Sequence, residues 1–258
     1  MNYKIGLKLW SINENYLEEA QRLFNKGLCQ YIELYVVPGR THEFLDMWTK
    51  LEVPYVIHAP HFEHGMNLAS KECRENNKKL AEETFLFADK LNADYIIFHP
   101  GFSGEIKETL FQLKQLNDKR IVVENKPYYS LVNGIICNGY SVEDIGFILE
   151  HSVCGFCLDI SHCICTANAL HFDPFLYLRK FLKLSPAMFH LSDSHFNGTI
   201  DNHLHIGKGD YNFKSILNLL PKDAIVTLET PKNSLIDLSD FEEDVMALNS
   251  VFGALEHE

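Results

Sequence analysis

The chain has 258 residues, of which 46% are hydrophobic and 22% charged, so it can bury a large core and does not have the composition of a disordered protein. A formal net charge of −12 argues against a broad basic surface for nucleic acid, although several divalent cations bound at one place would reverse the charge there. The sequence shows neither a signal peptide nor an apolar run long enough to span a membrane, and its seven cysteines are an odd number. We therefore expect a cytoplasmic protein with free thiols.

Eight short apolar runs rich in β-branched and aromatic residues predict eight strands. In chain order they cover residues 3–9, 31–37, 54–59, 94–100, 120–126, 153–160, 187–193 and 224–230. Segments with helical spacing lie between them, among them 15–27, which Gly27 should end, 70–91, 141–151, with Ser141 as its capping residue, and 238–252. Strands that alternate with helices predict a parallel sheet, and eight such units close into a (β/α)8 TIM barrel. We expect one α/β domain over residues 1–258.

The ends of the predicted strands carry residue types that bind metals. In a TIM barrel the active site lies at the C-terminal ends of the strands and on the loops that follow. A lone histidine or glutamate there could simply mark where a strand meets solvent, but nine on one rim indicate a metal site. One zinc takes about four ligands, so nine favour a multinuclear cluster with bridging carboxylates. The strand ends carry His58, His99, Glu124, Asp159, His190 and Glu229, and the adjoining loops carry His162, Asp201 and His203.

Two neighbouring patterns are less specific. Cys154 and Cys157 have the spacing of a metal knuckle, but they fall in a predicted strand, where residues three apart point to opposite faces, so packing is their expected role. His203 and His205 would lie on the same side of an extended segment, and His205 could then line the pocket without binding metal.

Seven motifs between residues 58 and 231 resemble the endonuclease IV family, the AP endonuclease family 2 branch of the xylose-isomerase-like barrels. They are HAPHFEHGMNL, FHPG, VVENKP, CLDISH, FHLSDS, DNHLHIGKGD and LETP. The resemblance implies three zinc ions that hydrolyse a phosphodiester, cutting DNA on the 5′ side of an abasic site. It implies a first zinc on His58, His99 and Glu124, a second on Glu124, Asp159, His190 and Glu229, and a third on His162, Asp201 and His203. Glu124, Glu229 and Asp159 are the candidate catalytic residues.

Substrate contacts are expected from five residues, namely His61, Arg40, Lys126, Lys208 and His205. The chain also departs from the family at three places. Lys8 stands where a histidine is expected, the loop after the second strand is short, and His61 replaces the usual aromatic residue against DNA. The DNA-reading loops are therefore expected to be reduced.

A sugar isomerase or epimerase is the main alternative. Related barrels bind a single Mn²⁺ or Mg²⁺ through a set that Glu124, Asp159, His190 and Glu229 would match, with the two glutamates moving a proton next to a carbonyl. A hydrolase for a small phosphorylated substrate and a non-catalytic metal-binding barrel stay open, because fold alone does not choose among them. The expected partner is abasic DNA, or a small phosphorylated or sugar substrate, bound by a monomer without a membrane.

Overall fold

Eight parallel strands close into a barrel in the computed structural model, which describes residues 3–132 and 134–255. Each strand pairs with the next along the chain, and β8 pairs with β1. The predicted (β/α)8 barrel is confirmed, and each predicted strand is present within about two residues of its expected bounds. The strands are β1 (Lys4–Trp10), β2 (Tyr31–Tyr35), β3 (Tyr55–His58), β4 (Ile96–Phe98), β5 (Ile121–Glu124), β6 (Gly155–Asp159), β7 (Met188–Leu191) and β8 (Ile225–Leu228).

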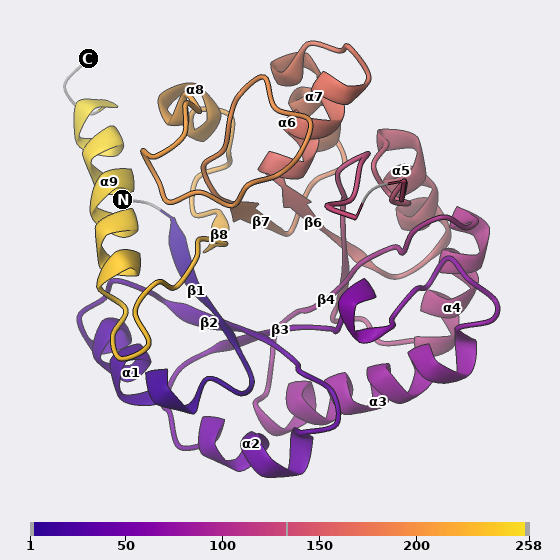
Figure 1. The fold of residues 1–258 in the computed structure, drawn as a ribbon, viewed down its shortest axis with the longest axis horizontal. Coiled ribbons are helices and arrows are strands. Elements are labelled where there is room, and N and C mark those ends of the chain that lie inside the picture. Colours follow the sequence, from indigo (N-terminus) through magenta and orange to yellow (C-terminus); the bar gives the residue numbers. More distant parts are fainter. Residues whose placement is uncertain (1–2, 133, 256–258) are drawn as a thin grey trace.

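Helices form an outer ring around these strands (Figure 1). Gly27, with a φ of +71°, follows the first of them, and the Ser141 side chain caps α5 by accepting from the backbone N–H of Asp144, as predicted. The helix predicted from residue 70 begins only at Arg74. The α-helices are α1 (Leu17–Asn25), α2 (Thr41–Trp48), α3 (Arg74–Lys90), α4 (Ile106–Leu116), α5 (Val142–His151), α6 (Ile160–Ala169), α7 (Pro174–Leu182), α8 (Phe213–Leu217) and α9 (Ser239–Leu255), with short 3₁₀ helices at Glu14–Tyr16 and Phe62–His64. In the ranges 3–132 and 134–255 no helix is both long and apolar enough to cross a membrane.

Side chains from six strands form a small buried cluster inside the barrel, separate from the main core. Their positions along the strands show which polar side chains lie in the next layer. The cluster consists of Tyr31, Val56, Ile97, Val122, Cys157 and Met188. Successive side chains of a strand point to opposite faces, so a residue two positions further along points the same way, one layer nearer the C-terminal end. Those positions hold Glu33, His58, His99, Glu124, Asp159 and His190.

Gly6 has the corresponding place on β1. A Cβ atom there would lie 2.2 Å from the ring of Tyr31, so only glycine leaves room for that ring. Two residues on, Lys8 enters the polar layer beside Glu33, its partner in the β1–β2 register. The apolar cluster thus supports a polar layer at the open end of the barrel.

Candidate metal centre

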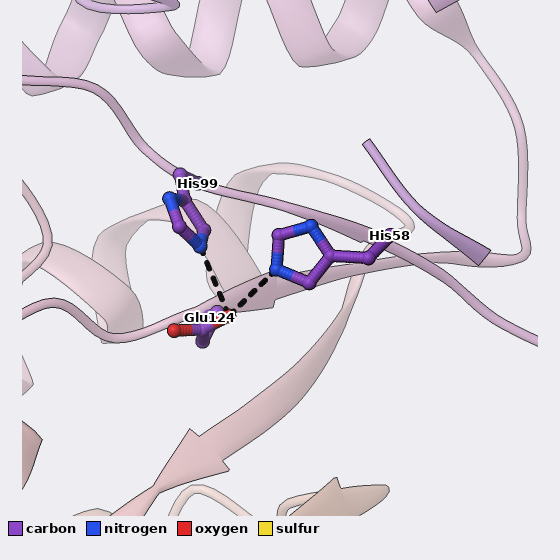
Figure 2. Close-up of side chains that lie close together, drawn as sticks. All are labelled: His58, His99 and Glu124. Atoms are coloured by element: carbon purple, nitrogen blue, oxygen red, sulfur yellow. Dashed lines mark hydrogen bonds and ion pairs between the residues drawn. The ribbon is translucent and has the colours of Figure 1, made fainter. Parts of the chain in front are cut away.

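The first group of candidate ligands comes from β3, β5 and the residue after β4. His58 Nε2 and His99 Nε2 lie 3.3 Å and 3.1 Å from the same oxygen of Glu124, Oε2 (Figure 2). The other nitrogen of His58, Nδ1, lies 2.7 Å from the carbonyl oxygen of Ala59. A carbonyl only accepts, so Nδ1 carries the proton and Nε2 is left with a lone pair directed at the group.

The second group surrounds His190. Its Nδ1 lies 2.7 Å from Glu229 Oε1, 3.5 Å from Glu124 Oε2 and 4.0 Å from Asp159 Oδ2. This nitrogen is buried without a hydrogen-bond partner. Burial, reinforced by the neighbouring carboxylates, raises the pKa of Asp159 to about 6. Three carboxylates and one imidazole thus crowd one small volume, and the repulsion among the carboxylates favours a bound cation.

The third group joins the start of α6 to the long loop after β7. Asp201 Oδ2 lies 3.4 Å from His162 Nε2 and 3.2 Å from His203 Nε2, and it is buried without a hydrogen-bond partner. Both imidazoles have Nδ1 next to a carbonyl oxygen, that of Asn125 at 2.9 Å and that of Glu229 at 3.1 Å. Their Nε2 lone pairs therefore face the carboxylate.

Two details of this group differ from expectation. His162 was expected in a loop, but it lies in the first turn of α6, because Asp159 caps that helix by accepting from the backbone N–H of His162 at 2.7 Å. The segment around His203 is not extended, since His203 has a φ of +47°. His205 consequently points elsewhere, with Nδ1 2.9 Å from Asp244 and Nε2 2.8 Å from Asn233.

The donor set fits divalent metal ions. In each group three ligand atoms lie within 4.8 Å of one another. Two candidate ligand atoms that are buried without a hydrogen-bond partner, His190 Nδ1 and Asp201 Oδ2, belong to the second and third groups. Buried lone pairs that face each other without a proton between them are unfavourable, and a cation that accepts them removes the cost. Imidazole and carboxylate ligands suit zinc, and carboxylates also suit manganese or magnesium.

Sequence patterns missed Glu33 and did not place Lys8 among the site residues. Glu33 is completely buried, and its Oε1 lies 3.1 Å from Lys8 Nζ. Lys8 also bonds to Glu229. On the other side of the site, Lys126 Nζ lies 3.0 Å from Glu124 Oε1 and 3.3 Å from His99 Nε2. Two ammonium groups therefore contact the candidate ligands directly.

A cavity of about 620 Å³ opens over the three groups. His61 and Lys126, both expected to contact substrate, line it, and the ring of His61 stacks on that of His99 with 5.6 Å between centroids.

The other three residues expected to contact substrate, Arg40, Lys208 and His205, lie outside the cavity. Arg40 pairs with Glu43 at 2.5 Å, and the Lys208 side chain is exposed. The structure thus gives these three no contact with the candidate site. Lys232, which the sequence patterns did not single out, lines the cavity near Glu229.

Asp193 organises the loop that carries Asp201 and His203. It is buried, and its carboxylate accepts backbone N–H bonds from Gly207 and Gly209 at 2.9 Å each, from Ser194 at 2.8 Å and from Tyr211 at 3.2 Å. Its role is therefore to hold the loop and not to bind metal.

We expect Asp193→Ala to lower the free energy of unfolding by about 3 kcal/mol, since hydrogen bonds to a charged group contribute roughly 1.5–3 kcal/mol each and water can replace part of them. Urea denaturation measures this. Asp210→Ala is the matched control, because Asp210 bonds the backbone N–H of Phe196 from the same loop. Equal losses for the two variants would contradict the organising role of Asp193.

Comparison with known proteins places the chain in a family. The sequence profile described as the xylose isomerase-like TIM barrel matches residues 29–250. The chain belongs to this family. A probable endonuclease 4 of Halothermothrix orenii is 29% identical over 206 residues, which cover 70% of this chain and 73% of that protein.

Solved structures that superpose on the chain confirm the barrel fold. A D-tagatose 3-epimerase-like protein superposes with a TM-score of 0.73 at 19% identity, covering 98% of each chain. Endonuclease IV from Thermus thermophilus superposes with a TM-score of 0.71 at 20% identity, covering 99% of this chain and 100% of that one. A structure named for an epimerase and one named for an endonuclease thus superpose on this chain about equally well, so the fold does not choose between them.

Proposed function

We propose that this chain is a metal-dependent phosphodiester hydrolase of the endonuclease IV type, with DNA containing abasic sites as the substrate class that the family resemblance implies. The observation that carries the proposal is the convergence of all nine predicted ligands into groups centred on Glu124, His190 and Asp201. A single-metal enzyme would need neither His58 and His99 nor the group of His162, Asp201 and His203.

Zinc ions held by these groups would lower the pKa of water and neutralise the charge that develops on a phosphoryl group. The side chains of the protein would position the metal ions and bind the phosphate group. Glu124 lies between the first and second groups, because its Oε2 approaches both His99 and His190. Lys8 and Lys126 come from β1 and from the end of β5, which are four strands apart and hence on opposite sides of the closed barrel. Their ammonium groups line the cavity and can bind phosphate oxygens from two directions.

Charge balance also favours three metal ions for an anionic substrate. Five carboxylates lie at the bottom of the cavity or buried beneath it, those of Glu33, Glu124, Asp159, Asp201 and Glu229. Two ammonium groups contact them, which gives a balance of minus three. Three divalent ions would turn this into plus three and attract a phosphodiester, whereas one divalent ion would leave it at minus one.

The rim of the cavity bears on the size of the substrate. Its exposed side chains include Trp10, Tyr129, Leu131, Ile200 and Leu235. The lysines of the cavity are Lys8 and Lys126, which contact the candidate ligands, and Lys232. Duplex DNA is held largely through many phosphate contacts, for which an apolar rim is a poor match. A small phosphodiester therefore has to be assayed beside abasic DNA.

Metal content and substrate turnover test the proposal together. For protein purified without added metal, we expect elemental analysis to find close to three zinc ions per chain, and we expect cleavage of a duplex with one abasic site or of a small aryl phosphodiester. An intact duplex of the same sequence is the control. One manganese or magnesium ion per chain, with no hydrolysis of either substrate, would contradict it.

A sugar isomerase or epimerase is the second candidate. Glu124, Asp159, His190 and Glu229 lie around one point and can hold a single metal, with the two glutamates on either side of a sugar carbonyl. The remaining negative charge would tolerate a neutral sugar. Interconversion of ketohexoses at one metal ion per chain would favour this candidate over the hydrolase.

A further inference from the structure

Glu33 is a buried carboxylate that neither motif nor strand end assigns to the site. It lies in the middle of β2, completely shielded from solvent. Its Oε2 lies 2.8 Å from His190 Nε2 and accepts a hydrogen bond from Thr227 Oγ1 at 2.7 Å. Its Oε1 lies 3.1 Å from Lys8 Nζ. Burying a charged carboxylate is costly unless it is paired and hydrogen-bonded, and these three partners supply both.

The contact with His190 fixes which nitrogen of that imidazole is free. An ionised carboxylate only accepts hydrogen bonds, so Nε2 has to carry a proton when it faces Glu33. The opposite nitrogen, Nδ1, is the unpartnered buried atom directed at Glu124 and Glu229. Histidines that bind metals commonly donate their second N–H to a carboxylate, which sets the ring orientation and strengthens the ligand.

We propose that Glu33 is a positioning residue that holds His190 as the Nε2–H tautomer and thereby presents Nδ1 to the second group of ligands. The proposal rests on the proposed function only through its metal centre and does not depend on which substrate is bound. Lys8 has a supporting part, because its ammonium group compensates the charge of Glu33 at Oε1, while His190 contacts Oε2. The pairing of Lys8 with Glu33 in the β1–β2 register brings these two side chains together.

Glu33→Gln tests this role with little change of shape. An amide can present either its oxygen or its NH₂ to Nε2, so the tautomer is no longer imposed and the negative charge is lost. We expect the affinity for one zinc ion to fall by about ten- to a hundredfold, the usual effect of removing such a partner. Competition between the protein and a chromophoric zinc chelator measures the affinity. Glu33→Asp, which keeps the charge on a shorter side chain, is expected to recover part of the loss.

Thr227→Val is the matched control, because it removes another hydrogen bond to the same carboxylate oxygen and leaves His190 its partner. It should bind zinc nearly as the unchanged protein does. Circular dichroism and thermal unfolding of the metal-free variants show whether each one folds.

Nitrogen-15 NMR of the imidazoles tests the proposal on the unchanged protein, and so does not depend on the variants folding. In the zinc-loaded chain, His190 should carry its proton on Nε2. A proton on Nδ1, or a folded Glu33→Gln protein with unchanged zinc affinity and the same tautomer, would overturn the proposal. The expected tautomer in a protein without phosphodiesterase activity would reject the proposed function while leaving the role of Glu33 intact.

Discussion

Replacing Glu124 with glutamine is expected to lower phosphodiester hydrolysis by about a thousandfold, which corresponds to roughly 4 kcal/mol of transition-state stabilisation. Its two oxygens serve different neighbours. Oε2 approaches His58, His99 and His190, while Oε1 lies 3.0 Å from Lys126 Nζ. Glutamine keeps one oxygen but replaces the other with an NH₂ group, which repels a cation and cannot pair with an ammonium group. One substitution therefore damages both the first and the second group.

Elemental analysis and steady-state kinetics of the same preparation measure the effect. We expect the variant to hold fewer metal ions than the unchanged chain while it keeps its circular dichroism spectrum. Lys126→Met is the informative companion, because it removes the charge next to Oε1 and leaves the candidate ligands in place. The Lys126→Met variant should have a higher KM for the phosphodiester and an unchanged metal content. A Glu124→Gln protein with a full metal complement and full activity would show that this carboxylate is not central.

The strand ends could be predicted as ligand positions because two regular features of a barrel coincide. Alternation along a strand directs every second side chain into the barrel, and the C-terminal ends of parallel strands all meet at one rim. Apolar residues such as Val122 and Cys157 lie two positions before Glu124 and Asp159, so the change from apolar to polar is visible in the sequence itself. Six of the nine candidate ligands were found in this way, and the other three came from the segments that follow the strands.

Glu33 was not predicted as a site residue, because the strands of a barrel are staggered and the middle of one strand can lie level with the end of another. It lies in the middle of β2, inside an apolar run, and strand ends alone do not reveal such a position. The register pairs it with Lys8 on β1, so the stagger brings it to the height of the ligands. The signal available in the sequence was its spacing of two from Tyr31, which belongs to the buried cluster inside the barrel.

Substrate contacts were the least predictable part, because loops have no periodicity to follow. Arg40 lies at the start of α2 and turns to Glu43, and His205 is directed toward Asp244 by the backbone turn at His203. Conversely, Lys232 follows β8 without any motif and still reaches the cavity. On irregular segments the sequence was only partly informative: Asp201 and His203 meet in the third group as expected, whereas Arg40 and His205 lie away from the cavity.

Replacing Asp201 and His203 together with alanine is expected to remove one metal ion per chain and to lower hydrolysis by about a hundredfold or more, a loss of roughly 3 kcal/mol in transition-state stabilisation. Both side chains come from the loop after β7, and in the third group they meet His162 alone. The first and second groups keep all of their ligands, so two metal ions should stay bound. His195→Ala, on the exposed part of the same loop and away from the cavity, is the matched control and should retain metal content and activity.

The double variant also separates the two candidate functions. A single-metal isomerase would use Glu124, Asp159, His190 and Glu229, none of which is altered, so its activity and its one metal ion would survive the substitution. A three-metal hydrolase would lose both its third ion and most of its turnover, because the charge that attracts the phosphodiester falls by one positive unit when a divalent ion and one carboxylate are removed together. Unchanged metal content in the double variant would refute the third site.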